Sequence, residues 1–144
     1  MEKDVSYGII PLTKNDLGFW KLYLVKHKNG DFWGFPKGHK ETHESEVDAA
    51  KRELFEETKL PIKRVLEKEP LLEKYQFKNH DGTDISKTVH YYLAEVDSEI
   101  KPVLQSEEIL DGGWFKPEEA IERITFDEGK RLCEQVIGKL RTIA

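Results

Sequence analysis

The sequence has a single cysteine, no long apolar run and no excess of basic residues. Because Cys133 has no second cysteine to pair with, an intramolecular disulfide is excluded and a reducing compartment is expected. The first ten residues, MEKDVSYGII, contain acidic side chains and lack the apolar stretch of a signal peptide or a membrane span. We therefore expect a cytoplasmic protein with no membrane attachment.

Charged residues make up 35% of the chain, are mixed in sign and form no long block of one charge. The net charge of −5 argues against a general nucleic-acid binder, so no stable nucleic-acid partner is expected. This negative charge remains compatible with a phosphorylated ligand, because divalent cations can lie between protein carboxylates and a polyanion. The length of 144 residues and the hydrophobic content of 38% predict one domain over residues 1–144, and we expect a monomer.

Short runs of β-branched and aromatic residues alternate with turn residues and predict strands. These strand candidates lie at residues 5–12, 19–25, 71–78, 87–96 and 112–115. Apolar residues at three- and four-residue spacing predict helices over residues 44–58, 118–124 and 127–141. This order predicts an α/β (α+β) fold in which a mixed β-sheet is sandwiched between α-helices.

The first predicted helix contains the segment RELFEET, residues 52–58, with three glutamates. Like charges three or four residues apart each cost a few tenths of a kcal/mol on a helix. A helical wheel puts Glu53, Glu56 and Glu57 along the border of the apolar stripe. A solvated acidic face is one interpretation, but carboxylates beside a core cannot all reach bulk water. A nearby lysine, a protein partner or a hard cation could compensate them.

Two neighbouring features bear on this choice. Arg52 can reach Glu44, two turns away, and Glu56, four residues on, either as an ordinary surface ion pair or as a planar fork that orients a carboxylate. Before the helix, Lys37 and His39 flank Gly38 in a loop able to expose backbone groups and basic side chains. Loop backbone, carboxylates and basic side chains are the components of a metal-bridged phosphate site.

As one unit, residues 38–60, GHKETHESEVDAAKRELFEETKL, resemble the box motif of the Nudix hydrolase superfamily. The matching positions are Gly38, Glu44, Arg52, Glu53, Leu54, Glu56, Glu57 and Leu60. Lys59 departs from the motif, which has glycine there. If that position requires a left-handed backbone, a non-glycine residue costs roughly 1 kcal/mol.

The resemblance extends over most of the chain. WGFPKGH at residues 33–39, KTVHYYLAEV at residues 87–96, and Glu108-Ile109 followed by Trp114-Phe115 look like the branch that hydrolyses diadenosine tetraphosphate asymmetrically. This branch implies the Nudix fold and metal-dependent attack of water on a polyphosphate chain, with release of ATP and AMP. The implied partner is a small-molecule dinucleoside polyphosphate.

The resemblance also implies roles for the carboxylates. Glu53, Glu56 and Glu57 would hold Mg²⁺ or Mn²⁺ with help from the Gly38 carbonyl. Glu108 matches the branch's downstream acid and is a candidate general base, with Glu53 as the alternative. Glu107 could take the part of Glu108 if the loop register slips by one residue. Arg52 joins Glu53, Glu57 and Glu108 as the candidate catalytic set, with Glu44 in a structural role.

The substrate would be held by basic and aromatic side chains. Lys87 and Tyr91 lie four residues apart on a predicted strand and so face the same side, as candidates for phosphate contact beside Lys37 and His39. Adenine requires aromatic faces for stacking, and Phe77 or its same-face neighbour Tyr75, together with Phe126, are the candidates. Core packing is the competing role for each of these aromatic residues.

Other functions remain open at this point. A Nudix enzyme could act on another nucleoside diphosphate derivative, such as a damaged nucleotide, ADP-ribose or capped RNA. A non-catalytic nucleotide-binding module could keep the fold, although it could lose Glu56 or Glu57 freely. A purely structural acidic helix would predict no stabilisation by metal.

Overall fold

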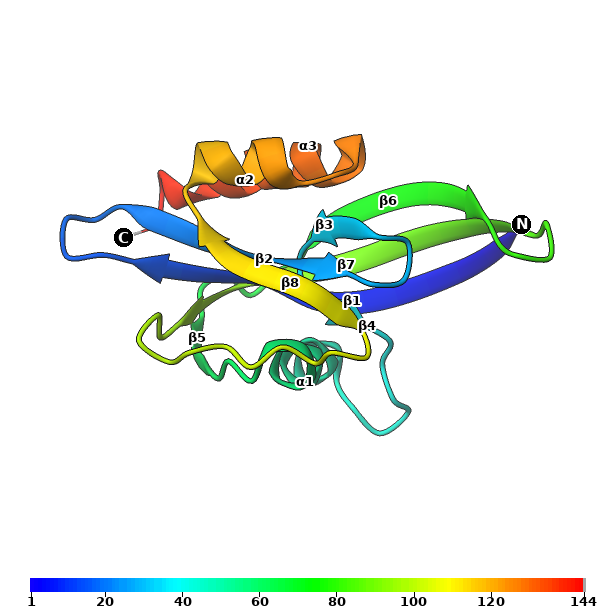
Figure 1. Ribbon diagram of the computed structural model, residues 1–144, viewed down its shortest axis with the longest axis horizontal. Helices are drawn as coiled ribbons and strands as arrows, with labels where there is room; N and C mark the ends of the chain where they lie inside the picture. Colours follow the sequence, from blue (N-terminus) through cyan, green and yellow to red (C-terminus); the bar gives the residue numbers. More distant parts are fainter. Residues whose placement is uncertain (144) are drawn as a thin grey trace.

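The computed structural model describes residues 1–143. Eight strands and three helices are present in these residues (Figure 1). The strands are β1 (Glu2–Lys14), β2 (Trp20–His27), β3 (Phe32–Gly34), β4 (Lys37–Gly38), β5 (Ile62–Val65), β6 (Leu71–Lys78), β7 (Asp84–Val96) and β8 (Ile109–Phe115). The helices are α1 (Glu46–Thr58), α2 (Pro117–Arg123) and α3 (Asp127–Leu140).

The strands form one mixed sheet in the order β3-β2-β1-β7-β5, with β8 paired to β2, β4 to β1 and β6 to β7. The long central strands β1 and β7 run parallel, in a register that begins at Glu2 and Ile85 and ends at Leu12 and Glu95. All the other pairs are antiparallel. The short strand β4 pairs with β1 through Tyr7–Gly38 and Gly8–Lys37, which brings the segment before α1 onto the centre of the sheet.

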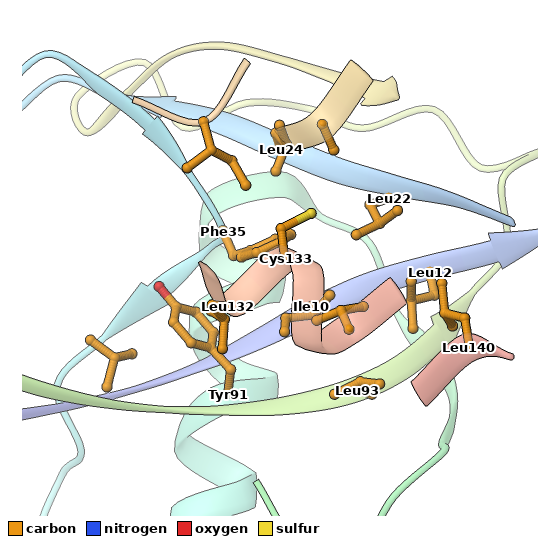
Figure 2. Close-up of a cluster of buried hydrophobic side chains, with 14 residues drawn as sticks. Ile10, Leu12, Leu22, Leu24, Phe35, Tyr91, Leu93, Leu132, Cys133 and Leu140 are labelled. Carbon is orange, nitrogen blue, oxygen red and sulfur yellow. The ribbon is translucent and has the colours of Figure 1, made fainter. Parts of the chain in front are cut away.

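Helix α1 covers one face of the sheet, and α2 and α3 cover the other (Figure 1). The α3 side is filled by aliphatic and aromatic side chains that include Ile10, Phe35, Tyr91 and Cys133 (Figure 2). A second apolar cluster, which includes Ala50 and Leu54, lies on the α1 side. Both sheet faces are therefore buried by helices, as the sequence predicts.

The ends of α1 are fixed by local chemistry. The Ser45 hydroxyl caps the first turn by accepting a hydrogen bond from the backbone N–H of Asp48 at 3.2 Å. At the other end Lys59 has φ of 61° and ψ of 15°, and its N–H donates to the Phe55 carbonyl. The position after RELFEET therefore does require the left-handed backbone that favours glycine.

The predicted α/β arrangement of a mixed sheet between helices is confirmed, and both predicted hairpins are present. Strands β1 and β7 start three residues before their predicted limits. The sequence analysis missed β3, β4 and β5. β3 has only three residues, Pro36 and Gly38 indicated irregular backbone around β4, and β5 has only four residues, two of them charged. Over residues 1–143 no helix is both long and apolar enough to span a membrane.

Candidate active site

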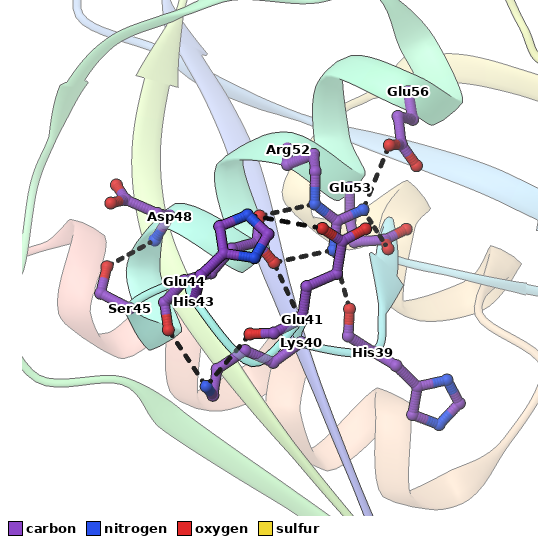
Figure 3. Close-up of polar contacts among 10 residues, drawn as sticks. All are labelled: His39, Lys40, Glu41, His43, Glu44, Ser45, Asp48, Arg52, Glu53 and Glu56. Atoms are coloured by element: carbon purple, nitrogen blue, oxygen red, sulfur yellow. Dashed lines mark hydrogen bonds and ion pairs between the residues drawn. The ribbon is translucent and has the colours of Figure 1, made fainter.

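Arg52, in the middle of α1, lies at the centre of a charged network that joins the helix to the loop before it (Figure 3). Its guanidinium donates two hydrogen bonds to Glu44, from Nε to Oε2 at 2.6 Å and from Nη2 to Oε1 at 3.0 Å. Nη1 also donates to Glu53 at 2.9 Å and to Glu56 at 3.1 Å, and Nη2 donates to the His39 carbonyl at 2.9 Å. One planar side chain thus fixes the loop and two helix carboxylates.

Glu44 is the firmest anchor of this network. Hydrogen bonds from Arg52 and from the backbone N–H of Glu41 lower the pKa of Glu44 to about 2. Reciprocally, hydrogen bonding to Glu44 raises the pKa of Arg52 further above its ordinary value. Arg52 makes two hydrogen bonds to Glu44, whose side chain is only 10% exposed. Arg52 is therefore a planar fork that orients a carboxylate, not a mobile surface ion pair.

Gly38 lies directly against the Glu53 carboxyl group. A β-carbon on residue 38 would come within 2.1 Å of Glu53 Cδ, closer than any real contact. Any β-carbon here would push the Glu53 carboxyl group aside, so glycine allows the loop backbone to lie next to a carboxylate of α1.

Glu57 is the most deeply buried of the three box glutamates, with 2% of its surface exposed. Its Oε1 has no hydrogen-bond partner. Burial, followed by the charges of Glu53 and Glu108, raises the pKa of Glu57 to about 9 against opposition from Lys37. A buried carboxyl oxygen without a partner is costly unless something supplies a compensating charge.

Glu53 and Glu56 border this group. Burial raises the pKa of Glu53, Arg52 lowers it, and the charges of Glu56 and Glu108 add to the increase. The Glu56 side chain is 47% exposed and faces Arg52. The helix thus has two buried carboxyl groups, at 53 and 57, and one that is open to solvent.

Glu108 lies in the turn before β8. Its backbone carbonyl accepts a hydrogen bond from Lys28 at 2.8 Å, and its own N–H donates to Gln105. The charge of Glu108 contributes to the raised pKa of both Glu53 and Glu57. The negative charge of Glu108 therefore acts on the box carboxylates, whereas Glu107 is not among the charges that shift their pKa.

The donor chemistry at this site fits a hard divalent cation. Glu53, Glu56 and Glu57 offer carboxylate oxygens, and the unpartnered Oε1 of Glu57 lacks the positive charge that such burial calls for. Within residues 1–143 no three acidic, histidine or cysteine side chains are gathered closely enough to form a ready-made ligand set. Arg52 donates to one oxygen, Oε1, of Glu53 and of Glu56, so a metal would bind these carboxylates through their other oxygen, Oε2.

Lys37 connects the carboxylates to the opposite face of the sheet. Its Nζ lies 5.9 Å from the centre of the Phe32 ring. Burial and the charge of Lys87 lower the pKa of Lys37, while Glu57, Glu73 and Asp4 act in the opposite direction. A half-buried ammonium group among several acids is suited to a polyphosphate that crosses the site.

Lys87 and Tyr91 face the α3 side of the sheet together, as their spacing predicts. Lys87 is buried and donates to Asp4 and to Ser6, each at 2.6 Å. Tyr91 packs edge-on against Phe35 in the apolar cluster and is 3% exposed (Figure 2). Neither side chain is open at the surface, and direct phosphate contact by either one stays a prediction.

The other substrate candidates are more accessible. His39 is exposed, and its Nε2 lies 2.9 Å from Asp4 Oδ1. Phe77 and Phe126 are 42% and 51% exposed, whereas Tyr75 is half-buried. Phe126 packs on Phe32 with ring centres 5.2 Å apart, and Phe77 lies beside Tyr75. An exposed aromatic face is thus present at Phe77 and Phe126, two of the three residues named for adenine stacking.

The sequence analysis did not identify two acidic residues beside the site, Asp4 and Glu73. Asp4 precedes the predicted first strand, and Glu73 is one of several charged residues in β6. Burial raises the pKa of Glu73 to about 7, partly opposed by Lys37. Neither residue belongs to a motif, and their positions depend on pairing of β1 and β6 with β7, so no local spacing could have identified them.

The fold and the site define the class: an α/β protein whose helix carboxylates and glycine-containing loop are suited to a metal-bridged phosphate ligand. The chain belongs to the Nudix family, because a model of the NUDIX domain matches residues 2–134. Nudix hydrolases are pyrophosphohydrolases that generally use a divalent metal.

Solved structures share the fold at low identity. A C. elegans Ap4A hydrolase in a binary complex is 23% identical with a TM-score of 0.75, over 96% of this chain and 98% of that chain. The NUDIX domain of Shewanella oneidensis NrtR with ADP ribose is 19% identical with a TM-score of 0.76, over 97% and 90%. An E. coli dihydroneopterin triphosphate pyrophosphohydrolase is 17% identical with a TM-score of 0.71, over 94% and 95%. At these identities the likeness shows the fold alone.

Proposed function

We propose that this protein hydrolyses dinucleoside polyphosphates, and diadenosine tetraphosphate in particular, to ATP and AMP. The observation that carries the proposal is the buried Glu57 carboxyl group, with an unpartnered oxygen beside Glu53 and the Gly38 loop. This arrangement provides strong oxygen donors at a position where a bridging cation would relieve an electrostatic cost.

The side chains divide the chemistry between them. Glu53, Glu56 and Glu57, with the Gly38 carbonyl, would hold Mg²⁺ or Mn²⁺, which supplies charge neutralisation of the phosphates. Glu108 or Glu53 accepts the proton of the attacking water. Arg52, fixed by Glu44, keeps Glu53 in a defined orientation.

Basic side chains then position the polyphosphate, and aromatic ones hold the bases. Lys37 and His39 contact the polyphosphate from the segment before α1. Lys87 and Tyr91 contact it from β7. Phe77 and Phe126 offer the partly exposed rings on which adenine can stack, a contact worth about 1–3 kcal/mol per base in nucleic-acid systems. A substrate with an aromatic base and a long polyphosphate uses both sets of side chains.

A substrate panel tests the proposal. Purified protein is incubated with Mg²⁺ and diadenosine tetraphosphate, ADP-ribose, an oxidised nucleoside triphosphate or capped RNA, and the products are separated by chromatography. We expect ATP and AMP from diadenosine tetraphosphate at the highest kcat/KM. Binding without turnover in both Mg²⁺ and Mn²⁺ would instead identify a non-catalytic module.

The Glu57→Gln variant tests the site itself. We expect its turnover to fall at least about a hundredfold, because a neutral amide replaces a carboxylate that would hold the metal. Glu122→Gln is the matched control, since Glu122 is exposed on α2 on the other side of the sheet. Near-wild-type activity of Glu57→Gln with Mg²⁺ would overturn the metal assignment.

A further inference from the structure

Asp4 joins three segments of the chain beside the candidate site. Its Oδ2 accepts a hydrogen bond from Lys87 Nζ at 2.6 Å, and its Oδ1 lies 2.9 Å from His39 Nε2. Asp4 and Lys87 are register partners on the parallel strands β1 and β7. The β4 pairing of Tyr7 with Gly38 brings His39 to the same place. The Asp4–Lys87 contact is therefore a product of the sheet topology, and His39 joins it from the loop that follows β4.

Lys87 depends on its contact with Asp4 because its side chain is buried. The Lys87 side chain is 6% exposed, and a buried ammonium group requires a counter-charge. Asp4 supplies that charge, and the Ser6 hydroxyl accepts a second hydrogen bond at 2.6 Å. Burial raises the pKa of Asp4, but hydrogen bonds and charge from Lys87 and His39 outweigh this effect, so the pKa lies below its ordinary value. Asp4 is therefore an anion fixed between two basic side chains.

The His39 contact leads directly to the box carboxylates. The His39 carbonyl accepts a hydrogen bond from Arg52, which also holds Glu53. The adjoining Gly38 has no free space against Glu53. A shift of the His39 backbone would therefore disturb the orientation of both Arg52 and Glu53.

We propose that Asp4 is a positioning residue for hydrolysis, which holds the Lys87 ammonium and the His39 loop in the arrangement that receives a polyphosphate. The inference rests on the proposed function. Asp4 acts through its neighbours and does not touch the reacting atoms. Since a misplacement of about 1 Å can cost about a hundredfold in rate, this contact affects catalysis as well as substrate affinity.

The test compares Asp4→Asn, Asp4→Glu and Asp31→Asn with the wild-type protein. Asp31 is the matched control, because it pairs with Lys26 in an exposed turn and has a φ of 50°, which asparagine also tolerates. Turnover of diadenosine tetraphosphate gives kcat and KM separately, and calorimetry with inorganic tripolyphosphate and Mg²⁺ measures binding without turnover. We expect Asp4→Asn to lower kcat at least about tenfold and tripolyphosphate affinity at least about fivefold. Asp4→Glu should recover part of both losses, and Asp31→Asn should lose neither.

The outcomes separate this inference from the proposed function. Wild-type protein that forms no ATP and AMP overturns the proposed substrate, while tripolyphosphate affinity still tests Asp4. Wild-type kcat and affinity in Asp4→Asn overturn the positioning role alone, as does tighter binding in that variant. If Asp4→Asn fails to fold, Lys87→Met is compared with the double variant Asp4→Asn/Lys87→Met, which removes both charges of the Asp4–Lys87 pair. Equal kcat in these two variants overturns the link through His39.

Discussion

At the scale of single residues, Glu57 couples ionisation to stability. Its pKa is raised to about 9 in the folded protein, above the ordinary value of 4.5 expected in the unfolded chain. Between these two pH values the folded protein keeps a proton that the unfolded chain has lost, so stability falls as the pH rises. We expect Glu57→Gln in EDTA to melt at least about 3 °C above the wild type at pH 8 and to lose this advantage near pH 4.

Differential scanning calorimetry of both proteins across this pH range provides the measurement. Glu122→Gln, which changes an exposed carboxylate on α2, should follow the wild-type curve. A Glu57→Gln variant that melts below the wild type at pH 8 would show that the Glu57 carboxylate is compensated in the metal-free protein.

Gly38 gives a second prediction at this scale. An added β-carbon would meet the carboxyl end of Glu53, a flexible side chain that can move aside. We expect Gly38→Ala to lower the melting temperature by less than about 4 °C, which corresponds to roughly 1 kcal/mol, but to lower kcat at least about tenfold. Gly138→Ala, which meets nothing within 4 Å in α3, is the control and should keep full activity. Equal activity of the two variants would contradict the close-packing role of Gly38.

At the scale of elements, the end of α1 is strained at Lys59. Replacement by glycine removes the left-handed strain but also the contact of Lys59 Nζ with the Phe55 ring, 5.2 Å from its centre. Strain relief of about 1 kcal/mol exceeds the value of an exposed cation–π contact, which is about 0.5–1 kcal/mol. The net gain is at most about 0.5 kcal/mol, so we expect Lys59→Gly to raise the melting temperature by up to about 2 °C.

Lys59→Ala separates the two effects. Alanine loses the contact with Phe55 but keeps the β-carbon that opposes a left-handed backbone. Thermal melts should therefore rank glycine above wild type and wild type above alanine. An alanine variant as stable as the glycine variant would show that φ of 61° costs little at this position.

The same elements show how far sequence reasoning reaches. α1, β6 and the box were predictable because periodicity and spacing act over a few residues, and RELFEET fixes the position of three carboxylates at once. Strand β4 was not predictable, because two residues after a proline form a strand only when β1 lies beside them. Asp4 and Glu73 join the site through pairing with a strand more than ten residues away in sequence, so a single segment contains no signal for them.

At the scale of the whole molecule, the proposed metal site would link metal binding to folding. There a divalent cation would bind the ionised carboxylates, whereas the metal-free protein keeps Glu57 protonated up to a pH of about 9. Metal binding must therefore release a proton below that pH, and Mg²⁺ should stabilise the protein more strongly as the pH rises.

We expect the increase in melting temperature produced by a fixed excess of Mg²⁺ over EDTA to grow steadily from pH 6 to pH 9. In Glu57→Gln, which has no proton to release there, the increase should be small and nearly independent of pH. Titration calorimetry in buffers of different ionisation enthalpy counts the released protons directly. A Mg²⁺ effect of the same size at pH 6 and pH 9 in the wild type would show that Glu57 is already ionised before the metal binds. The compensating charge would then have to come from within the protein, and Lys37, which acts on Glu57 from the loop, is the side chain placed to supply it.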